Sequence, residues 1–245
     1  MTSARNIIVL ENTKVLATQA AVEFQTRSHA AIKDHGHFAV ALCGGNTPKA
    51  MLELLSGTDF AEDINWSAVH VFWGDERCVP PDNANSNYGM AAAALLSKVS
   101  LPAENIHRMH GELEPHEGAV DYNEQLRAFF AGPTAFDINF LGLGNDGHTA
   151  SLFPNTAALA VVDELCSENL VEEPVASPWR LTLTYPALNA SRAVFFLVEG
   201  GSKANIVAEV IDGPRDVQRL PSQGIIPAGT LTWLLDKAAA SKLRK

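Results

Sequence analysis

The segment FDINFLGLGNDGH, residues 136–148, is the best guide to the fold, because a short apolar run passes directly into a polar, glycine-rich loop. Three other segments are built the same way: FAVALCGGNTP (38–48), VHVFWGDER (69–77) and AVFFLVEGGSK (193–203). Such short apolar runs are typical of strands that are buried on both faces of a parallel sheet. Parallel strands end along one edge of their sheet, and ligands bind at that edge. We therefore expect these four loops to form one site.

Strands and helices alternate along the chain. Strands are expected at 6–10, 38–42, 69–73, 136–141, 181–184 and 193–198, and helices at 13–34, from 47 onward, between 86 and 96, at 117–130, from about 203 onward and at 231–243. This alternation predicts an α/β fold with a mostly parallel sheet that carries helices on both faces. No shift in composition divides the chain, so residues 1–245 are expected to form a single domain, with a loop around 172–178.

Charge and composition narrow the class of protein. The formal net charge of −10 argues against a nucleic-acid partner, since binding to a duplex usually needs a basic surface. The apolar run at 7–10 is too short for a signal peptide, and no apolar run reaches membrane-spanning length. The three cysteines are widely spaced and fit neither a disulfide framework nor a CxxC metal site. We expect a cytoplasmic protein with no membrane partner.

The loop Gly44-Gly45-Asn46-Thr47 leads into the N-terminus of a predicted helix. Glycines let backbone N–H groups approach an oxyanion, and the helix dipole favours negative charge there, so a phosphate is the natural ligand. The alternative is a tight turn in which Thr47 caps the helix. This loop alone supports the two interpretations about equally, and the GxxxxGK[ST] spacing of a P-loop is absent.

Asp146 and His148 form the strongest candidate catalytic pair. A histidine titrates near neutral pH and can take a proton from water, while a nearby carboxylate fixes its tautomer. Alternatively, Asn145 or Asp146 caps a helix that begins near Thr149, with His148 as a passive residue. The other three loops favour catalysis. GLGNDG also satisfies GxGxxG, which is only weak evidence for a dinucleotide, because Asp146 would repel a pyrophosphate.

Arg77 and Lys203 are candidate ligands for an anion, and Arg180, which precedes a strand, is a weaker one. A lone cation is usually a solvated surface charge. However, Lys203 stands at a predicted helix start, where it works against the dipole, so another role is indicated. Asp75 and Glu76 are interpreted as one catalytic and one structural carboxylate, with a loop salt bridge to Arg77 as the alternative.

A metal site is not expected. Three histidines, His107, His110 and His116, lie close together in the sequence, but no cysteine accompanies them. Their spacing matches no recognised zinc pattern.

Taken together, these segments resemble the 6-phosphogluconolactonase family, within the wider sugar-phosphate isomerase-like superfamily. The resemblance covers nearly the whole chain in order and rests on ALCGGNTP (41–48), WGDERCVPPDNANSN (73–87), FDINFLGLGNDGHTASLFP (136–154), RLTLTYPALNASR (180–192), GGSKA (200–204) and LPSQGIIPAGTLTWLLD (220–236). It implies a Rossmann-like α/β domain and hydrolysis of 6-phospho-D-glucono-1,5-lactone, with no metal and no organic cofactor. The expected partner is a sugar-phosphate substrate, and the protein is expected to be a monomer or a small homo-oligomer.

By the same resemblance, His148 would be the general base that activates water. The phosphorylated substrate would be surrounded by Gly44, Gly45, Asn46, Thr47, Arg77, Arg180 and Lys203. The first loop of the family usually reads SGGSTP, whereas here Cys43 and Asn46 replace the serines. No GxSxG elbow is present, so a covalent acyl-enzyme is not expected.

Three other functions compete with the lactonase. A glucosamine-6-phosphate deaminase would share the fold, but those enzymes typically have Asp-Glu-Tyr at the position of residues 75–77 and a glutamate at that of Phe153. A non-catalytic sugar-phosphate sensor would explain the anion loops but does not need the Asp146-Gly147-His148 arrangement. A sensor that regulates transcription would also need a DNA-binding segment, and none is visible. An NAD-dependent oxidoreductase is the weakest of the three.

Overall fold

A six-stranded parallel sheet forms the centre of the computed structural model, which describes residues 5–171 and 177–244. Its order is β1-β9-β8-β5-β2-β3, with strands β1 (Arg5–Leu10), β9 (Thr230–Asp236), β8 (Ala193–Val198), β5 (Ile138–Leu141), β2 (Phe38–Leu42) and β3 (Val69–Trp73). A small antiparallel sheet has the order β4-β7-β6, with strands β4 (Asp75–Arg77), β7 (Trp179–Leu183) and β6 (Cys166–Leu170). The prediction of an α/β fold with a mostly parallel sheet is confirmed.

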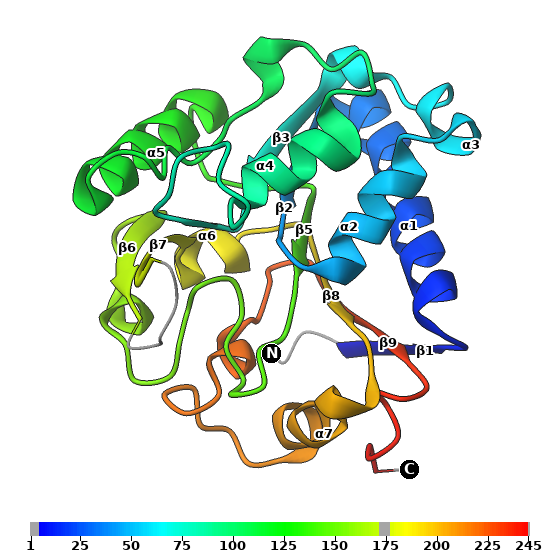
Figure 1. The fold of residues 1–245 in the computed structure, drawn as a ribbon, viewed down its shortest axis with the longest axis vertical. Helices are drawn as coiled ribbons and strands as arrows, with labels where there is room; N and C mark the ends of the chain where they lie inside the picture. The colour runs from blue at the N-terminus through cyan, green and yellow to red at the C-terminus, as the bar shows by residue number, and fades with distance from the viewer. Residues whose placement is uncertain (1–4, 172–176, 245) are drawn as a thin grey trace.

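Helices cover both faces of the parallel sheet, with α1 and α2 on one side and α5, α6 and α7 on the other (Figure 1). The α-helices are α1 (Thr13–His35), α2 (Asn46–Leu55), α3 (Thr58–Ala61), α4 (Asn87–Ala91), α5 (Pro115–Phe130), α6 (Tyr185–Asn189) and α7 (Ala204–Asp212). Shorter helical turns include η5 (Gly201–Lys203) and η6 (Pro221–Gly224), and a π-helical turn (Ala92–Leu96) extends α4.

Local sequence explains where the helices begin and end. The Asn12 side chain accepts a hydrogen bond from the backbone N–H of Val15 at 3.1 Å and so caps α1. Gly36 ends that helix with φ at +87°, a conformation that suits glycine. The hydroxyl of Ser86 accepts from the N–H of Gly89 at 2.9 Å and so caps α4, within the range 86–96 where a helix was predicted.

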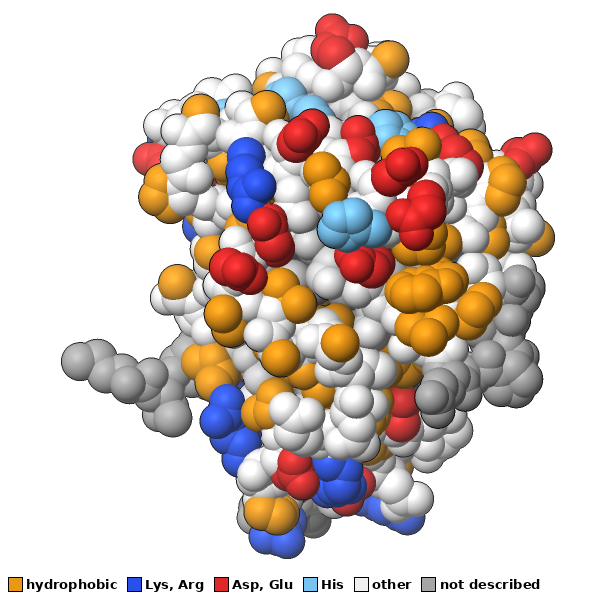
Figure 2. All heavy atoms as spheres, turned by 90° about the vertical axis from the view of Figure 1, so that its left-hand side faces the viewer, with side chains coloured by type: hydrophobic (Ala, Val, Ile, Leu, Met, Phe, Trp, Pro, Cys, Tyr) orange, Lys and Arg blue, Asp and Glu red, His pale blue; other side chains and the backbone are white. Residues whose placement is uncertain are grey.

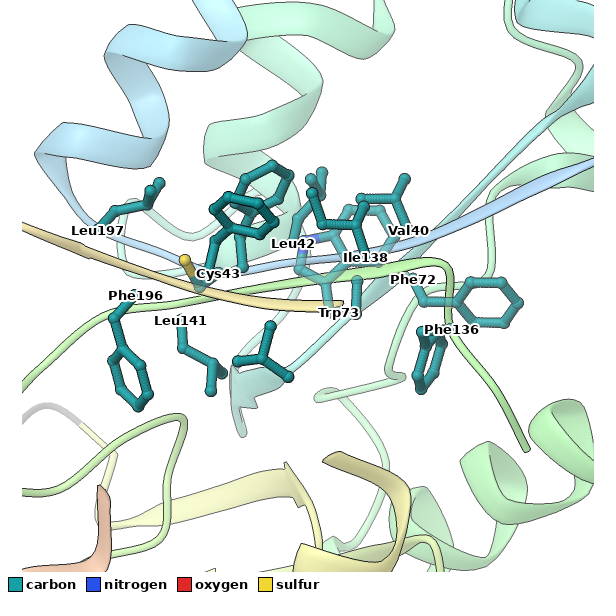
Figure 3. Close-up of a cluster of buried hydrophobic side chains, with 14 of the residues drawn as sticks. Val40, Leu42, Cys43, Phe72, Trp73, Phe136, Ile138, Leu141, Phe196 and Leu197 are labelled. Atoms are coloured by element: carbon teal, nitrogen blue, oxygen red, sulfur yellow. The ribbon is translucent and has the colours of Figure 1, made fainter. Parts of the chain in front are cut away.

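The core lies along the inner strands of the parallel sheet. All residues of β2, FAVAL, are at most 1% exposed, and every residue of β8 is buried as well. Phe196 and Leu197 follow one another in β8 and point to opposite faces of the sheet (Figure 3). Packing on both faces explains why these strands are continuous apolar runs instead of alternating ones.

The order in which the chain adds strands to the sheet changes direction, and the switch point lies between β2 and β5. From β2 it continues to the neighbouring β3, whereas β5 lies on the other side of β2 and leads to β8 and then β9. In open α/β sheets, ligands bind outside the carboxyl ends of the strands at such a switch point. The loops after β2 and β5 therefore flank the place where the fold itself favours a ligand.

The helix predicted at 231–243 is wrong, because residues 237–243 form turns and Thr230–Asp236 is the strand β9. This strand lies between β1 and β8 and pairs in parallel with both. The segment TLTWLLD is buried from its second residue onward. A short apolar run buried on both faces has no period that distinguishes strand from helix, and its threonine and tryptophan content was the signal for a strand.

Three smaller differences concern the loops. Residues 75–77 form the short strand β4 instead of a loop, and the predicted strand at 181–184 is β7 of the antiparallel sheet. No helix begins at Thr149, where the chain instead makes a turn with a bridge to Leu152. Of the loop predicted around 172–178, residues 172–176 lie outside the described residues. Within the described part of the chain, no helix is long and apolar enough to cross a membrane.

Candidate active site

The four strand-to-loop junctions meet in one cavity at the carboxyl edge of the sheet. Its volume is about 450 Å³, which is within the usual range for small-molecule sites. It is lined by Cys43, Gly44, Gly45, Asp75, Arg77, Asn87, Gly142, Leu143, Gly144, Asn145, Asp146, His148, Ala150 and Lys203. Each of the four loops therefore contributes at least one residue to the wall, and polar groups converge there.

His148 and Asp146 are hydrogen-bonded to one another at the edge of this cavity. The Nδ1 atom of His148 lies 2.6 Å from Oδ1 of Asp146, and the backbone N–H of His148 donates to the same oxygen at 3.1 Å. An ionised carboxylate can only accept hydrogen bonds, so the proton of the neutral imidazole resides on Nδ1. The lone pair of Nε2 is then available to take a proton.

Two glycines allow the loop to adopt this geometry. A Cβ atom on Gly144 would lie 2.1 Å from Nδ1 of His148 and 2.6 Å from Oδ1 of Asp146, so only glycine leaves room for the pair. Gly147 has φ at +86°, in the left-handed region that side chains disfavour. The glycine-rich sequence therefore serves to place the imidazole, which gives GLGNDG a role that requires no dinucleotide.

Phe153 packs against one face of the His148 imidazole. The rings of His148 and Phe153 are stacked, with centroids 4.0 Å apart and planes at 26°. The Phe153 side chain is 8% exposed and packs as part of the core. Phe153 was not predicted as a site residue, because its contact with His148 depends on the turn at residues 149–152.

Burial and neighbouring groups shift the pKa values of Asp146 and Lys203. Partial burial would raise the pKa of Asp146, but its hydrogen bonds with His148 and the charge of that residue outweigh burial, so the pKa of this carboxyl is lowered. Burial lowers the pKa of Lys203, and the nearby negative charge of Asp146 opposes this shift. A cation at the start of α7 thus faces a cavity that already holds a carboxylate.

Asp75 lies in the wall of the cavity and holds two neighbouring side chains in place. Its side chain is 8% exposed and accepts hydrogen bonds from Ser151 Oγ at 2.7 Å and from Asn87 Nδ2 at 3.2 Å. Asn87 in turn lies so close to Gly44 that a Cβ atom there would be 2.0 Å from its Oδ1. Asn87 and Ser151 were not predicted as site residues. Their contacts join segments far apart in the sequence and leave no local signal.

Glu76 is the structural carboxylate of the pair at 75–76. It is 2% exposed and accepts from the backbone N–H groups of Arg77, Asn87 and Tyr88 at 2.7–2.8 Å and from Ser86 Oγ at 3.0 Å. Burial raises the pKa of this carboxyl, although those hydrogen bonds oppose the shift. Glu76 therefore holds the start of α4, which carries Asn87.

The remaining predicted residues differ in how they relate to the cavity. Arg77 lines it, with one guanidinium nitrogen donating to the carbonyl of Asn85 at 2.5 Å. Arg180 lies opposite Arg77 in the β4–β7 pair but is buried, donates to the carbonyls of Ser177 and Trp179, and does not line the cavity. Asn46 and Thr47 form the first turn of α2 and lie outside the lining.

Histidines 107, 110 and 116 do not come together. His107 pairs with His70 at 3.1 Å, His110 with Asp121 at 2.7 Å and His116 with Glu168 at 3.3 Å. Among the described residues, no group of three or more histidine, cysteine or acidic side chains is arranged to hold a metal ion.

Known proteins that resemble this chain show the broad class to which it belongs. The family model for glucosamine-6-phosphate isomerases and 6-phosphogluconolactonase matches residues 11–233. A monomeric glucosamine-6-phosphate deaminase of solved structure, 20% identical, shares the fold with a TM-score of 0.82 over 97% of this chain and 99% of that one. The chain thus belongs to the class of proteins that this family model describes, and it shares the fold of the deaminase.

Relatives with higher sequence identity show which family within this class the chain belongs to. A 6-phosphogluconolactonase of Synechocystis sp. is 43% identical over 98% of this chain and 99% of its own length, and one of Mycobacterium tuberculosis is 36% identical over 97% and 98%. The solved structure of 6-phosphogluconolactonase from Trypanosoma cruzi has a TM-score of 0.86 at 29% identity, covering 100% of this chain and 99% of that one. The chain belongs to the 6-phosphogluconolactonase family.

Proposed function

We propose that this protein hydrolyses 6-phospho-D-glucono-1,5-lactone to 6-phospho-D-gluconate in the cavity described above, with His148 as the general base. The reaction is supported by relatives named 6-phosphogluconolactonase, which match nearly the whole chain at 34–43% identity. The single observation that supports the role of His148 is its 2.6 Å contact with Asp146 at the sheet's switch point. Such an orienting carboxylate is the usual partner of a catalytic histidine.

The proposed reaction begins at Nε2 of His148. This atom takes a proton from a water molecule while the water oxygen attacks the lactone carbonyl carbon. Asp146 holds the imidazole through Nδ1 and stabilises the cation that forms. The tetrahedral intermediate collapses by breaking the bond to the ring oxygen, and the imidazolium returns its proton to that oxygen. Atoms and charges balance, and the histidine is neutral again.

The non-reacting phosphate supplies the orientation. We assign it to the backbone N–H groups of the Gly44–Gly45 loop at the start of α2 and to Lys203, which face the cavity from the ends of β2 and β8, on either side of β5. Arg77 or a backbone N–H of the loop stabilises the developing oxyanion. Fixing a remote anionic group uses its binding energy to hold the carbonyl near His148.

Asn46, Thr47 and Arg180 support this site from outside the lining. Asn46 and Thr47 form the first turn of the helix whose N–H groups face the phosphate. Arg180 lies directly across the sheet from Arg77 and places positive charge behind it. Asp75 keeps Asn87 and Ser151 in place and is assigned to positioning, without proton transfer.

We further infer a cytoplasmic enzyme of a single domain, either a monomer or a small homo-oligomer, that uses no cofactor. The cysteines Cys43, Cys78 and Cys166 are all free thiols, which suits a reducing compartment. On the face around α5, β6 and β7, acidic side chains gather in the upper half with few basic ones (Figure 2). Such a surface repels a nucleic-acid backbone.

Hydrolysis of freshly generated 6-phosphogluconolactone tests the proposal. Wild type should accelerate the reaction well above its spontaneous rate, and His148→Ala should return it to near background. Acceleration retained by the variant would remove His148 from its role while keeping the reaction. Ammonia release from glucosamine 6-phosphate would instead indicate a deaminase, and tight binding of 6-phosphogluconate without acceleration would indicate a sensor.

A further inference from the structure

A second cavity lies between α7, β9 and the segment 221–226. Its volume is about 180 Å³, and it shares no lining residue with the catalytic cavity. Val210, Ile225 and Leu231 form part of an apolar wall, and each is buried. A space of this size is below the range typical of drug-sized ligands, so it suits a small molecule with a short apolar body.

Two guanidinium groups stand among the lining residues of this cavity. Arg5 and Arg215 are both exposed, and within the described ranges neither forms an ion pair. Arg5 donates one hydrogen bond to the carbonyl of Ile211 at 2.8 Å. In a chain of net charge −10, two cations without acidic partners beside one apolar cavity attract an anion to it.

Two buried side chains of the wall also lack partners. Ser222 and Trp233 are each 2% exposed and line the cavity, and neither Ser222 Oγ nor Trp233 Nε1 has a hydrogen-bond partner in the described part of the chain. Buried donors are almost always satisfied in folded proteins. Because both atoms are themselves buried, they do not reach a ligand in the cavity, and the two arginines are the groups that recognise an anion there.

The wall of this cavity also touches the catalytic loop. The backbone N–H of Ser222 donates to the carbonyl of Gly147 at 3.0 Å. Leu220, directly before this segment, packs so closely against Gly147 that a Cβ atom on Gly147 would lie 2.6 Å from Cδ2 of Leu220. Because this segment lines the second cavity and also contacts the catalytic loop, a test must separate binding here from binding beside His148.

We propose that this second cavity is a binding site for a small monocarboxylate with a short apolar chain. The carboxylate lies by Arg215 and Arg5, and the chain lies against Val210, Ile225 and Leu231. Charge selects the anion and volume limits its length. This site is independent of the lactone-binding groups, so its ligand and the sugar phosphate bind at the same time.

Calorimetric titration with hexanoate tests this site. Wild type should bind one hexanoate, binding should persist when 6-phosphogluconate saturates the catalytic cavity, and hexanol should bind about tenfold more weakly because it lacks the charge. Arg215→Gln should weaken hexanoate binding by about tenfold as well. Arg215 is exposed and makes no hydrogen bond in the described residues, so the variant should keep the wild-type melting temperature.

Arg219→Gln is the matched control. Arg219 lies just before the segment 221–226, pairs with Glu209 at 2.6 Å and does not line the cavity, so hexanoate affinity should be unchanged. Absence of measurable binding to wild type would overturn the proposal. So would displacement of hexanoate by 6-phosphogluconate, which would place the anion in the catalytic cavity, and so would unchanged affinity in Arg215→Gln.

Discussion

The phenyl ring of Phe153 is stacked on the imidazole of His148, with centroids 4.0 Å apart. The imidazole also lies close to Gly144, and its Nδ1 atom meets the carboxylate of Asp146. Three residues therefore hold the ring, and Nε2 is the nitrogen left for chemistry. This arrangement explains why a long motif is needed around one histidine.

Removing the stacked ring should impair turnover more than binding. Phe153→Leu keeps an apolar side chain but loses the flat surface that orients the imidazole, and small misplacements of a catalytic group can cost up to about 10²-fold in rate. We expect kcat to fall by about tenfold with KM changed less than about twofold. Steady-state kinetics on fresh lactone measures both, and a loss confined to KM would contradict the positioning role.

A methyl group at residue 144 should displace the imidazole. In Gly144→Ala the added carbon would lie 2.1 Å from Nδ1 of His148, so the ring must move and the pair with Asp146 is broken. The expected loss of kcat is about 10²-fold or more. Gly142→Ala is the comparison, because its added carbon meets no atom within 4 Å, and it should lose far less. Equal losses in the two variants would refute the steric explanation.

Asp146→Asn tests the tautomer. The amide is nearly the same size as the carboxylate but can donate to Nδ1, which moves the imidazole proton to Nε2 and removes the base. Since the pKa of Asp146 is lowered, through its contacts with His148 that outweigh burial, the wild-type carboxylate is ionised at neutral pH. We expect kcat to fall by about 10²–10⁴-fold with the fold intact. A variant with wild-type kcat and an unchanged circular dichroism spectrum would show that Asp146 only shapes the loop.

Much of this site was predictable because its strands are short, buried and parallel. The runs at 38–42, 69–73 and 193–198 appear in the structure with the predicted bounds, and the polar loops that follow them meet as expected. Periodicity could not show that Thr230–Asp236 joins the sheet, since a run buried on both faces lacks a period, and only its residue composition favoured a strand. The contacts of Asn87 with Asp75 and Gly44 depend on tertiary packing, so no local pattern could reveal them.

Stability should decrease on mild acidification because of His107. Burial, reinforced by neighbouring His70, lowers the pKa of His107 from 6.5 to about 4. Between these two pKa values, His107 binds a proton in the unfolded chain but not in the folded chain. The free energy of unfolding therefore decreases as pH falls from about 6.5 towards 4. Because the side chain is only partly buried, we expect a contribution of about 1–2 kcal/mol.

The variant His107→Phe checks this origin. It keeps a ring on Phe72, on which His107 is stacked with centroids 4.3 Å apart, but it cannot be protonated. Urea unfolding at pH 7 and pH 5 should show a smaller difference between the two pH values than wild type. His29→Gln, at an exposed histidine, should leave that difference as it is. If the stability of His107→Phe differed between pH 7 and pH 5 as much as that of wild type, the effect would belong to other groups.

Lys203 should distinguish phosphate binding from catalysis at the carbonyl. If it holds the phosphate, Lys203→Gln should lower kcat/KM for 6-phosphogluconolactone by about 10–100-fold. The same variant should hydrolyse glucono-1,5-lactone, which has no phosphate, as well as wild type does. Lys237→Gln, at an exposed lysine paired with Glu11, controls for the lost charge and should behave as wild type with both lactones. Equal losses for the two substrates in Lys203→Gln would place this lysine at the reacting carbonyl instead, and Arg77 and the Gly44–Gly45 loop would then have to hold the phosphate without it.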